Sequence, residues 1–422
     1  MSVHRPRIAV VGAGISGLSA AWVLQRSADV TLYEADDRLG GHAHTHDVAR
    51  TSGAPLAVDS GFIVHNEKTY PTLLRLFAAL GVATMASDMS MSVRCEGCGL
   101  EYAGARGLRG LFPAVDNLRR PAYLRMLAEV PRFHRAARAL LHTAPSSPEP
   151  TLGQFVAAHG WSDYFVAHFL APVVAAVWSC APGTAMQYPA RYLFRFLDHH
   201  GMLAVTGSPP WRTVVGGSRS YVTAISKDLS AVHTATPVRA LTRTPVGVAV
   251  RDDSDTVAEF DSVVVATHPD QALRLLTAPT ALESALLGAI PYSVNHTVLH
   301  TDPAPMPRRP GARASWNYRL SGCQGTADSV QVTYDMNRLQ SLPGPMSYLV
   351  SLNDPEVDPD RVIARMVYEH PIYSPESVAA QARLPELDDD RIVFAGAYQG
   401  WGFHEDGAAS GVRAAARLGV TW

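Results

Sequence analysis

A strand-turn-helix pattern near the N-terminus constrains the fold of this chain more than any other feature. The apolar run from Ile8 to Val11 predicts a buried parallel strand that stops at Gly12, and a helical pattern begins at Gly14. In such a turn the first glycine permits the bend, the second lets the backbone approach a pyrophosphate, and the third, Gly17, lets the helix pack on its strand. We therefore expect a dinucleotide-binding unit.

Two neighbouring features specify the ligand further. The free N–H groups of Ile15 and Ser16 would face the phosphates, with the helix dipole behind them. The next apolar run ends at Glu34, 20 residues after Gly14, where a carboxylate can accept both hydroxyls of an adenosine ribose. An acid at that position disfavours a phosphorylated ribose, so NADP is not expected.

The composition favours a globular enzyme of two joined domains. The chain has 422 residues, of which 47% are apolar and 18% are charged. Lysine and arginine number 36 against 38 acidic residues, so no basic excess points to nucleic acid. The first strand begins close to Met1 without a secretory signal, and no apolar run is long enough to span a membrane. We expect a cytoplasmic protein with at most peripheral membrane contact.

The cysteines are too few to suggest a disulfide scaffold. Cys95 and Cys98 form a CxxC, but no second pair follows at zinc-ribbon spacing, because only Cys180 and Cys323 remain. The pattern from Cys95 to Tyr102 is therefore interpreted as a glycine-containing turn of a hairpin.

Three alternating histidines, His42, His44 and His46, share one face of an extended segment and could in principle bind a metal. No carboxylate or cysteine completes a ligand set nearby in the sequence, and His42 can face a phosphate instead. We predict no metal site.

Two further segments are expected to contact the cofactor. Arg38, Gly40 and Gly41 would bring a cation and bare backbone back over the pyrophosphate. The small residues Ser60 and Gly61, followed by Phe62, form a turn after another short strand, and a turn without bulk suits a flat ring system.

The nucleotide-binding pattern returns twice later in the chain. A strand-turn-helix spans 211–217, a strand begins at Val238, and the buried run 262–267 contains Ala266. A last strand ends at Gly396 before a helix that contains Ala408. A second helix N-terminus aimed at the cofactor suits a reduced flavin, which carries negative charge far from its phosphates. This consideration favours FAD over NAD.

Taken together, these residues resemble the flavin-containing amine oxidase and desaturase superfamily. The resemblance rests on Gly12-x-Gly14-x-x-Gly17, Glu34, Arg38-x-Gly40-Gly41, Gly216-Gly217, Phe394-Ala-Gly396 and the glycines from Gly407 to Gly411. It implies an α/β fold: a discontinuous Rossmann-like FAD-binding domain of amine-oxidase type (1–70, 205–288 and 386–422). An α+β substrate domain with a helical lid (71–204 and 289–385) would accompany it. The implied cofactor contacts are Gly12, Gly14, Ile15, Ser16, Gly17, Glu34, Ala35, Arg38, Gly40, Gly41, His42, Ser60, Gly61, Phe62, Val238, Ala266, Gly396, Phe403, His404, Gly407 and Ala408.

Departures from the family pattern bear on how the flavin is held. His42 stands where an arginine is usual, and Ala397 stands where an acid often follows Phe-Ala-Gly. The C-terminal segment lacks the cysteine that attaches flavin in covalent members, which implies noncovalent FAD, with a histidyl linkage through His42 as the alternative. The chain looks most like a bacterial branch found beside cyclopropane-fatty-acid-synthase-type methyltransferases, which implies lipid chemistry and a fatty-acid methyltransferase as partner.

The resulting hypothesis is an FAD-dependent oxidoreductase that transfers a hydride between flavin and a largely apolar small molecule or lipid, such as a fatty acyl chain. An amine oxidase producing hydrogen peroxide and a flavin-binding accessory subunit of a lipid methyltransferase are the alternatives. The resemblance places His296 where amine oxidases carry a lysine facing the flavin, although a buried structural histidine is the simpler interpretation. His404, beside Phe403, is the competing catalytic candidate.

Overall fold

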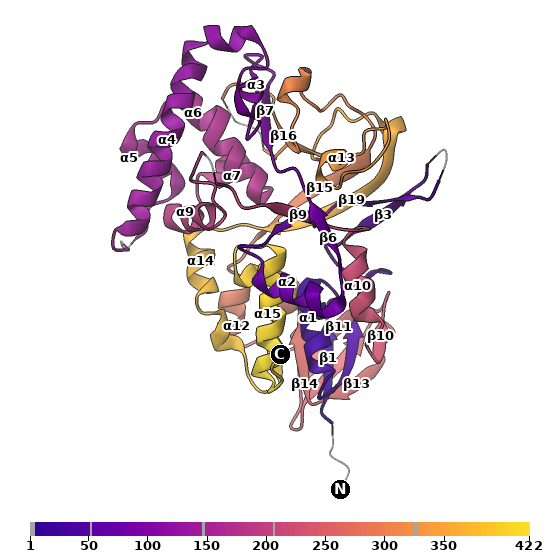
Figure 1. Cartoon of the computed structure of the whole chain (residues 1–422). Helices are drawn as coiled ribbons and strands as arrows, with labels where there is room; N and C mark the ends of the chain where they lie inside the picture. Colours follow the sequence, from indigo (N-terminus) through magenta and orange to yellow (C-terminus); the bar gives the residue numbers. More distant parts are fainter. Residues whose placement is uncertain (1–4, 51–52, 146–147, 206, 325–327) are drawn as a thin grey trace.

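The computed structural model describes residues 5–50, 53–145, 148–205, 207–324 and 328–422, which form two lobes (Figure 1). The lower lobe in that view contains both described chain ends and is built on a five-stranded parallel sheet. Its strand order is β10 (Ala231–His233), β2 (Asp29–Tyr33), β1 (Arg7–Val11), β14 (Ser262–Val265) and β20 (Ile392–Phe394). Strands far apart in sequence are therefore neighbours, as a discontinuous nucleotide-binding domain requires.

The two faces of this sheet are covered differently, because successive side chains of a strand point to opposite sides. Ile8 and Val10 of β1 pack against helices, whereas Ala9 and Val11 belong to the core on the other face. The first face is covered by α1 (Ile15–Leu24), α2 (Pro71–Leu80), α10 (Arg219–Ser226) and α15 (His404–Arg417). The second face is covered by β11 (Val238–Arg243), β12 (Val248–Asp252), β13 (Val257–Phe260), α11 (Pro269–Leu275), α12 (Ala281–Leu287), α14 (Pro375–Gln381) and η5 (Leu384–Leu387).

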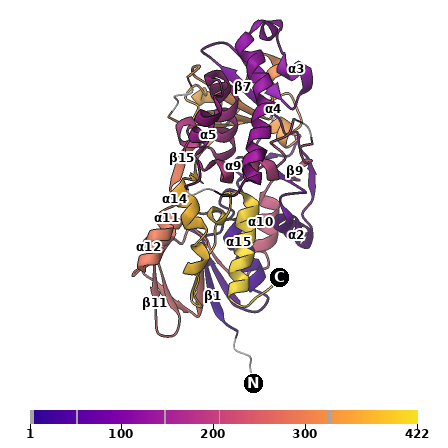
Figure 2. The same cartoon turned by 90° about the vertical axis from the view of Figure 1, so that its left-hand side faces the viewer.

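The domain limits from the sequence differ from this packing at two helices. The predicted limits put α2 and α14 in the substrate domain. In the structure Leu73, Leu76 and Phe77 of α2 lie in the core around α1, and Ala380 of α14 lies in the core below the sheet. Both helices therefore pack as part of the nucleotide-binding lobe, because their apolar faces are complementary to its surface (Figure 2).

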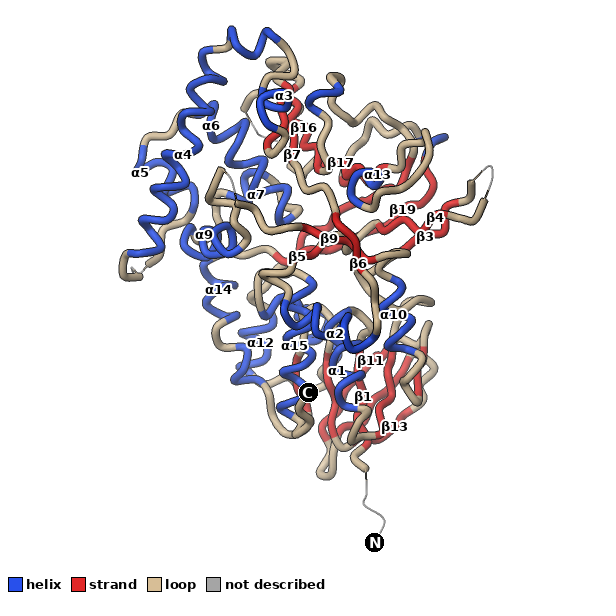
Figure 3. Tube along the Cα trace, in the orientation of Figure 1, coloured by secondary structure: helices blue, strands red, loops and turns tan. Residues whose placement is uncertain are grey.

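The upper lobe contains a seven-stranded sheet, antiparallel except where β7 lies parallel to β16. Its order is β19 (Val362–Pro371), β15 (Tyr292–His300), β18 (Leu349–Leu352), β17 (Val332–Asp335), β16 (Trp316–Leu320), β7 (Met91–Cys95) and β8 (Glu101–Gly104). Helices gather beside this sheet, on the left in Figure 3. They include α4 (Pro121–His142), α5 (Leu152–His159), α6 (Asp163–Phe165), α7 (Ala171–Trp178) and α9 (Ala190–His199), with α13 (Met336–Leu339) on the opposite side. The π-helix η2 (Val166–Leu170) joins α6 to α7, α8 (Pro182–Ala185) follows α7, and α3 (Gly107–Leu111) follows β8.

Two small sheets lie between the lobes (Figure 3). One pairs β3 (Thr45–Val48) with β4 (Leu56–Asp59), and the other has the order β5 (His65–Asn66), β9 (Trp211–Val214) and β6 (Thr84–Ala86). The remaining short 3-10 turns are η1 (Val115–Arg119), η3 (Pro310–Ala312), η4 (Pro359–Arg361) and η6 (Ala397–Gln399). Among the described residues, no helix has the length and apolarity needed to cross a membrane.

Candidate functional site

The glycine turn between β1 and α1 is closed toward the sheet and open at one point. Gly12 has φ +98°, and a Cβ there would lie 2.7 Å from the carbonyl oxygen of Ala266. A Cβ at Gly17 would lie 1.9 Å from the carbonyl oxygen of Gly12, so neither position tolerates a side chain. At Gly14, by contrast, a Cβ would meet no heavy atom within 4 Å. The open side of the turn is therefore at Gly14, where the unpaired N–H groups of the first helical turn begin.

Glu34 and the segment after it surround this opening. The Glu34 carboxylate accepts the N–H of Ala13 at 2.7 Å and that of Asp36 at 3.0 Å, while Ala35 is exposed. Arg38 donates to the carbonyl oxygen of Gly41 at 2.9 Å. A Cβ at Gly41 would lie 3.1 Å from Gly14 Cα, and the Gly40 N–H donates to Ala13 O at 2.8 Å. The predicted phosphate loop is thus in direct contact with the segment from Arg38 to Gly41.

His42 lies partly buried between the two lobes. Its ring lies 4.9 Å from that of Tyr368 and 5.2 Å from that of His370, both on β19. Burial lowers the pKa of His42 well below its usual value, so the ring is neutral at physiological pH. Its Nε2 is a buried polar atom with no protein partner among the described residues. A neutral ring with one free nitrogen can hydrogen-bond a cofactor but cannot replace the charge of an arginine.

The other two histidines of this segment bond hydroxyl groups and do not converge on a common point with His42. His44 Nδ1 lies 3.0 Å from the Tyr368 hydroxyl, and His46 Nε2 lies 2.9 Å from Ser60 Oγ. Ser60 Oγ also contacts the Tyr368 hydroxyl at 2.6 Å. Burial lowers the pKa of His44 to about 3.

The turn at Gly61 was expected to leave room for a flat ring, but its neighbour is the protein backbone. A Cβ at Gly61 would lie 2.1 Å from the carbonyl oxygen of His42, and the Phe62 N–H donates to the same oxygen at 2.7 Å. Phe62 stacks on His404 with ring centroids 3.8 Å apart and an interplanar angle of 7°. The glycine therefore permits two loops to approach each other, and Phe62 contributes to a buried aromatic stack.

The C-terminal helix α15 brings its N-terminus to that of α1. A Cβ at Gly407 would lie 2.6 Å from Ile15 Cγ2, and one at Gly411 would lie 2.1 Å from the carbonyl oxygen of Ser16. These glycines allow close helix packing, with Ala408 fully buried beside them. Because Gly407 is in the first turns of α15 and Ile15 begins α1, both helix dipoles have their positive ends at the same edge of the sheet.

Two remaining predicted contacts have packing roles in the structure. A Cβ at Gly396 would lie 2.1 Å from the ring of Tyr398, so this glycine accommodates a buried tyrosine. Val238 is buried at the start of β11. Two residues before Val238, the N–H of Thr236 donates to the carbonyl oxygen of Glu34 at 2.9 Å, next to the end of β2.

The structure does not bring His296 to this region. His296 lies on the exposed face of β15, whereas its neighbours Asn295 and Thr297 are buried. Alternation along the strand turns Asn295 inward instead, and its Nδ2 lies 3.0 Å from His370 Nδ1. His404, the other catalytic candidate, is buried with Nε2 2.8 Å from the Tyr221 hydroxyl, and burial lowers its pKa to about 3.

Sequence reasoning missed the residues that β19 contributes. Tyr368 and His370 lie on one face of this strand and contact the histidine segment of the nucleotide-binding lobe. Burial lowers the pKa of His370 to about 4, so this ring is also neutral. The signal available in the sequence was the alternation of Ala364, Met366, Tyr368 and His370, but it does not reveal which lobe that face meets.

A pocket of about 160 Å³, which we name the aromatic pocket, lies where α2, the end of α9 and the loop before α15 meet. Its lining consists of Thr69, Tyr70, Pro71, His199, His200, Trp401, Phe403, Glu405 and Asp406. Three donors anchor the loop through the carbonyl oxygen of Gly400: the hydroxyls of Tyr192 and Tyr373 and the amide of Gln381. The helical lid and the nucleotide-binding lobe thus fix this wall of the pocket together.

A larger and more open hollow of about 540 Å³ exists on the upper lobe. Arginines and acids line it, including Arg94, Arg308, Arg361 and Glu356. It shares no residue with the glycine turn, the segment from Glu34 to His46 or the aromatic pocket. Of these two pockets, the aromatic pocket is the one that adjoins helix α15, which packs on the phosphate loop.

The residues present fit a bound dinucleotide. The open Gly14 position, two converging helix N-termini and the unpartnered His42 Nε2 are features that an extended cofactor along this edge would use. These features do not by themselves distinguish one flavin protein from another.

Comparison with known proteins identifies the family. The sequence model of the family described as flavin containing amine oxidoreductase matches residues 15–322. A candidate flavin-containing monoamine oxidase, AofH of Mycobacterium tuberculosis, is 26% identical over 360 residues, which cover 80% of this chain and 72% of that protein.

Solved structures share the fold over nearly the whole chain. The cyclohexylamine oxidase from Brevibacterium oxydans superposes with a TM-score of 0.69 at 16% identity, covering 98% of this chain and 99% of that one. The CLA-producing fatty acid isomerase from P. acnes gives 0.69 at 16% identity, covering 97% and 98%. Since the family model spans well over half of the sequence, the chain belongs to the flavin-containing amine oxidoreductase family and is an FAD-dependent oxidoreductase.

Proposed function

We propose that this enzyme transfers a hydride between noncovalently bound FAD and a largely apolar substrate whose reacting segment occupies the aromatic pocket. FAD, when bound, supplies the redox chemistry through its flavin ring. The observation that carries the proposal is the character of the pocket wall: Tyr70, Trp401 and Phe403 are aromatic, and His199 and His200 are neutral rings. Burial lowers the pKa of His200 to about 4 and lowers that of His199 as well.

The two acids at the pocket are already used by the protein backbone. Glu405 accepts the N–H groups of Thr72 and Leu73, each at 2.9 Å, and so caps the start of α2. Asp406 accepts the N–H of Phe403 at 2.9 Å, and burial raises its pKa to about 6. A carboxylate engaged in this way offers less to an incoming ammonium group than a free one does.

The size of the pocket restricts what it can enclose. A protein cavity of about 150 Å³ holds one benzene molecule, so a pocket of about 160 Å³ encloses one ring or a few methylene groups. A fatty acyl chain, including a methylated or cyclopropane-containing one, would place only its reacting segment there. The rest of such a chain would lie outside the pocket.

The test is a ligand series in which chain length and head group vary independently. Binding of alkyl carboxylates, alcohols and amines is followed by the change in flavin absorbance, and flavin reduction is followed anaerobically. We expect affinity to increase about fourfold per methylene over the few methylenes that the pocket can enclose, since each buried methylene contributes about 0.8 kcal/mol, whatever the head group. Phe403→Ala should flatten this dependence, whereas Phe112→Ala, at the distant end of the upper lobe, should not.

An amine oxidase is the second candidate, favoured by the AofH relative and by the two acids in the pocket wall. Rapid flavin reduction by short primary amines, with no response to fatty acyl compounds, would establish it and overturn the apolar-substrate proposal. Association with a fatty-acid methyltransferase stays a prediction of the sequence resemblance, to be tested by co-purification of the two proteins.

A further inference from the structure

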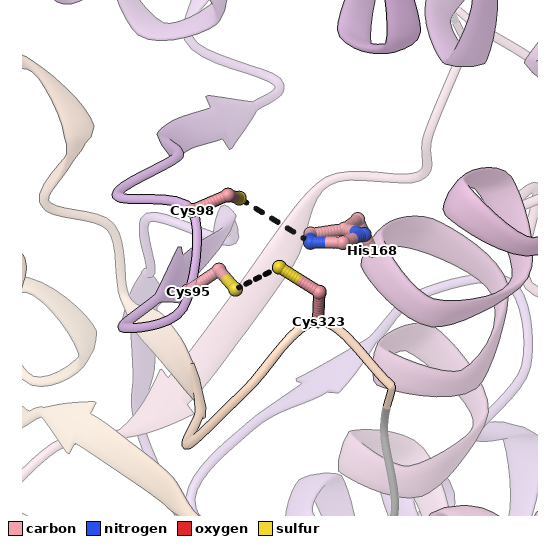
Figure 4. A group of neighbouring side chains, drawn as sticks. All are labelled: Cys95, Cys98, His168 and Cys323. Atoms are coloured by element: carbon pink, nitrogen blue, oxygen red, sulfur yellow. Dashed lines mark hydrogen bonds between the residues drawn. The ribbon is translucent and has the colours of Figure 1, made fainter.

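Four potential metal ligands from three separate segments meet at the end of the upper sheet that is farthest from β19. Cys95 ends β7, Cys98 lies in the following turn, His168 lies in the π-helix η2, and Cys323 follows β16 (Figure 4). The parallel pairing of β7 with β16 sets Cys95 opposite Leu320, three residues before Cys323. One ligand atom from each of the four residues lies within 4.8 Å of all the others.

Two of the ligand-to-ligand distances in this cluster match the edges of a tetrahedral site. Cys95 Sγ and Cys323 Sγ are 3.8 Å apart, and Cys98 Sγ is 3.6 Å from His168 Nε2. For bonds of about 2.3 Å to sulfur and about 2.05 Å to nitrogen, the edges of a zinc tetrahedron are about 3.8 Å (S to S) and about 3.6 Å (S to N). All four cysteines of the chain are free thiols, and the sulfurs of Cys95 and Cys323, 3.8 Å apart, are too far apart for a disulfide.

The histidine is held in the tautomer that a metal requires. His168 Nδ1 lies 3.1 Å from the carbonyl oxygen of Tyr164, an acceptor, so Nδ1 carries the proton and the lone pair is on Nε2. Nε2 is the atom that faces Cys98. The Tyr102 hydroxyl donates to the carbonyl oxygen of His168 at 2.8 Å, which fixes the wide π turn. Such supporting bonds are typical of metal-ligating histidines.

The backbone around the cysteines brings the two loops together. A Cβ at Gly97 would lie 3.0 Å from Cys323 N and 3.1 Å from Cys323 Sγ, so a glycine there permits the close approach. The Cys95 N–H donates to Leu100 O and the Gly99 N–H donates to Cys95 O, which closes the turn. Arg120 donates to the carbonyl oxygen of Cys98 at 2.6 Å. This cation would offset the single net negative charge of three thiolates around a divalent ion.

We propose that Cys95, Cys98, His168 and Cys323 bind one zinc ion in a structural site. Thiolate and imidazole ligands in a tetrahedral arrangement select zinc, and four protein ligands leave no position for substrate. The three thiols would release their protons on binding. The ion would fasten the helical lid, through η2, to the edge of the substrate sheet, without taking part in the flavin chemistry.

The test begins with metal analysis of the FAD-loaded enzyme purified without a histidine tag from zinc-replete medium. We expect about one zinc per chain after gel filtration in the presence of EDTA. Cys323→Ser is the main variant, because the exposed Cys323 is the ligand whose replacement disturbs packing least, and its zinc content should be near zero. Cys180→Ser, which replaces the one cysteine outside the cluster, should retain the metal.

A second measurement on the unmodified chain does not depend on how a variant folds. Protein produced with cobalt in place of zinc should show the visible absorption of tetrahedral cobalt with thiolate ligands, in a one-to-one ratio to chain. Zinc-free protein would overturn the proposal, as would a Cys95–Cys323 disulfide found by mass spectrometry. Stoichiometric iron in place of zinc would overturn the assignment of the ion.

Discussion

Gly14 offers a test in which cofactor binding separates from folding. Its backbone angles, φ −70° and ψ 178°, are accessible to alanine, and the added methyl group would meet no protein atom within 4 Å. The fold of Gly14→Ala should therefore be stable to within roughly 1 kcal/mol of the parent, which is the usual range for such a cap position. The methyl group would instead occupy the open side of the turn, where the pyrophosphate has to approach.

The expected loss of FAD affinity follows from the hydrogen bonds that a displaced phosphate gives up. Losing one charge-assisted bond to the first turn of α1 costs roughly 1.5–3 kcal/mol, which corresponds to a 10- to 150-fold higher Kd. Titration of apoprotein with FAD, followed by flavin fluorescence, measures this change. Thermal unfolding of the same apoprotein measures the stability.

Two other glycines provide the controls. Gly17→Ala should be destabilised by about 3 kcal/mol or more even without FAD, because its methyl group would lie 1.9 Å from the backbone oxygen of Gly12. Gly183→Ala, in α8 with open space around it, should change neither FAD affinity nor folding by a comparable amount. An unchanged Kd for Gly14→Ala would refute the assignment of this turn to the pyrophosphate.

Three further expectations concern single side chains. Glu34→Ala should weaken FAD binding by roughly 1.5–3 kcal/mol in the same titration, and an unchanged Kd would exclude a ribose contact. His404 has a folded pKa of about 3 against about 6.5 unfolded, so the unfolded chain binds the extra proton and stability is lost as the pH falls below about 6.5. His404→Gln can still bond Tyr221 but does not titrate in this range. It should therefore reduce the pH dependence of the unfolding free energy between about pH 6 and pH 4 by up to about 1.4 kcal/mol per pH unit. Denaturant titration in excess FAD measures this change. His296→Ala should leave single-turnover flavin reduction within about fivefold of the parent, well short of the roughly 10²-fold effect of an acid–base residue, and a larger loss would restore His296 to the mechanism.

Burial also explains why most histidines near the site serve as neutral groups. His42, His44, His370 and His404 all have pKa values lowered chiefly by desolvation, since few acids lie near them. A neutral imidazole can donate or accept one hydrogen bond at physiological pH without changing the charge of the site. These four histidines can therefore hydrogen-bond without adding charge between the lobes.

The sequence by itself determined the nucleotide-binding unit. The strand from Arg7 to Val11, the glycine turn, the helix and the acid at Glu34 depend on interactions within one short stretch, so their pattern and spacing are visible without the fold. The family resemblance predicted the cofactor and the enzyme class in the same way, from motifs spread along the chain.

Only the tertiary structure decided which faces and which distant residues meet. Asn295 and His296 are adjacent in the sequence, and the alternation of the strand turns Asn295 inward and His296 outward. Strand pairing therefore decides which of the two side chains faces the interior. The CxxC lies in the turn of the β7–β8 hairpin, as the sequence predicted, but the two residues that approach its cysteines lie 70 and 228 residues away along the chain. The parallel pairing of β7 with β16 and the packing of η2 against β7 bring them together, and no local pattern in the sequence encodes contacts of that range.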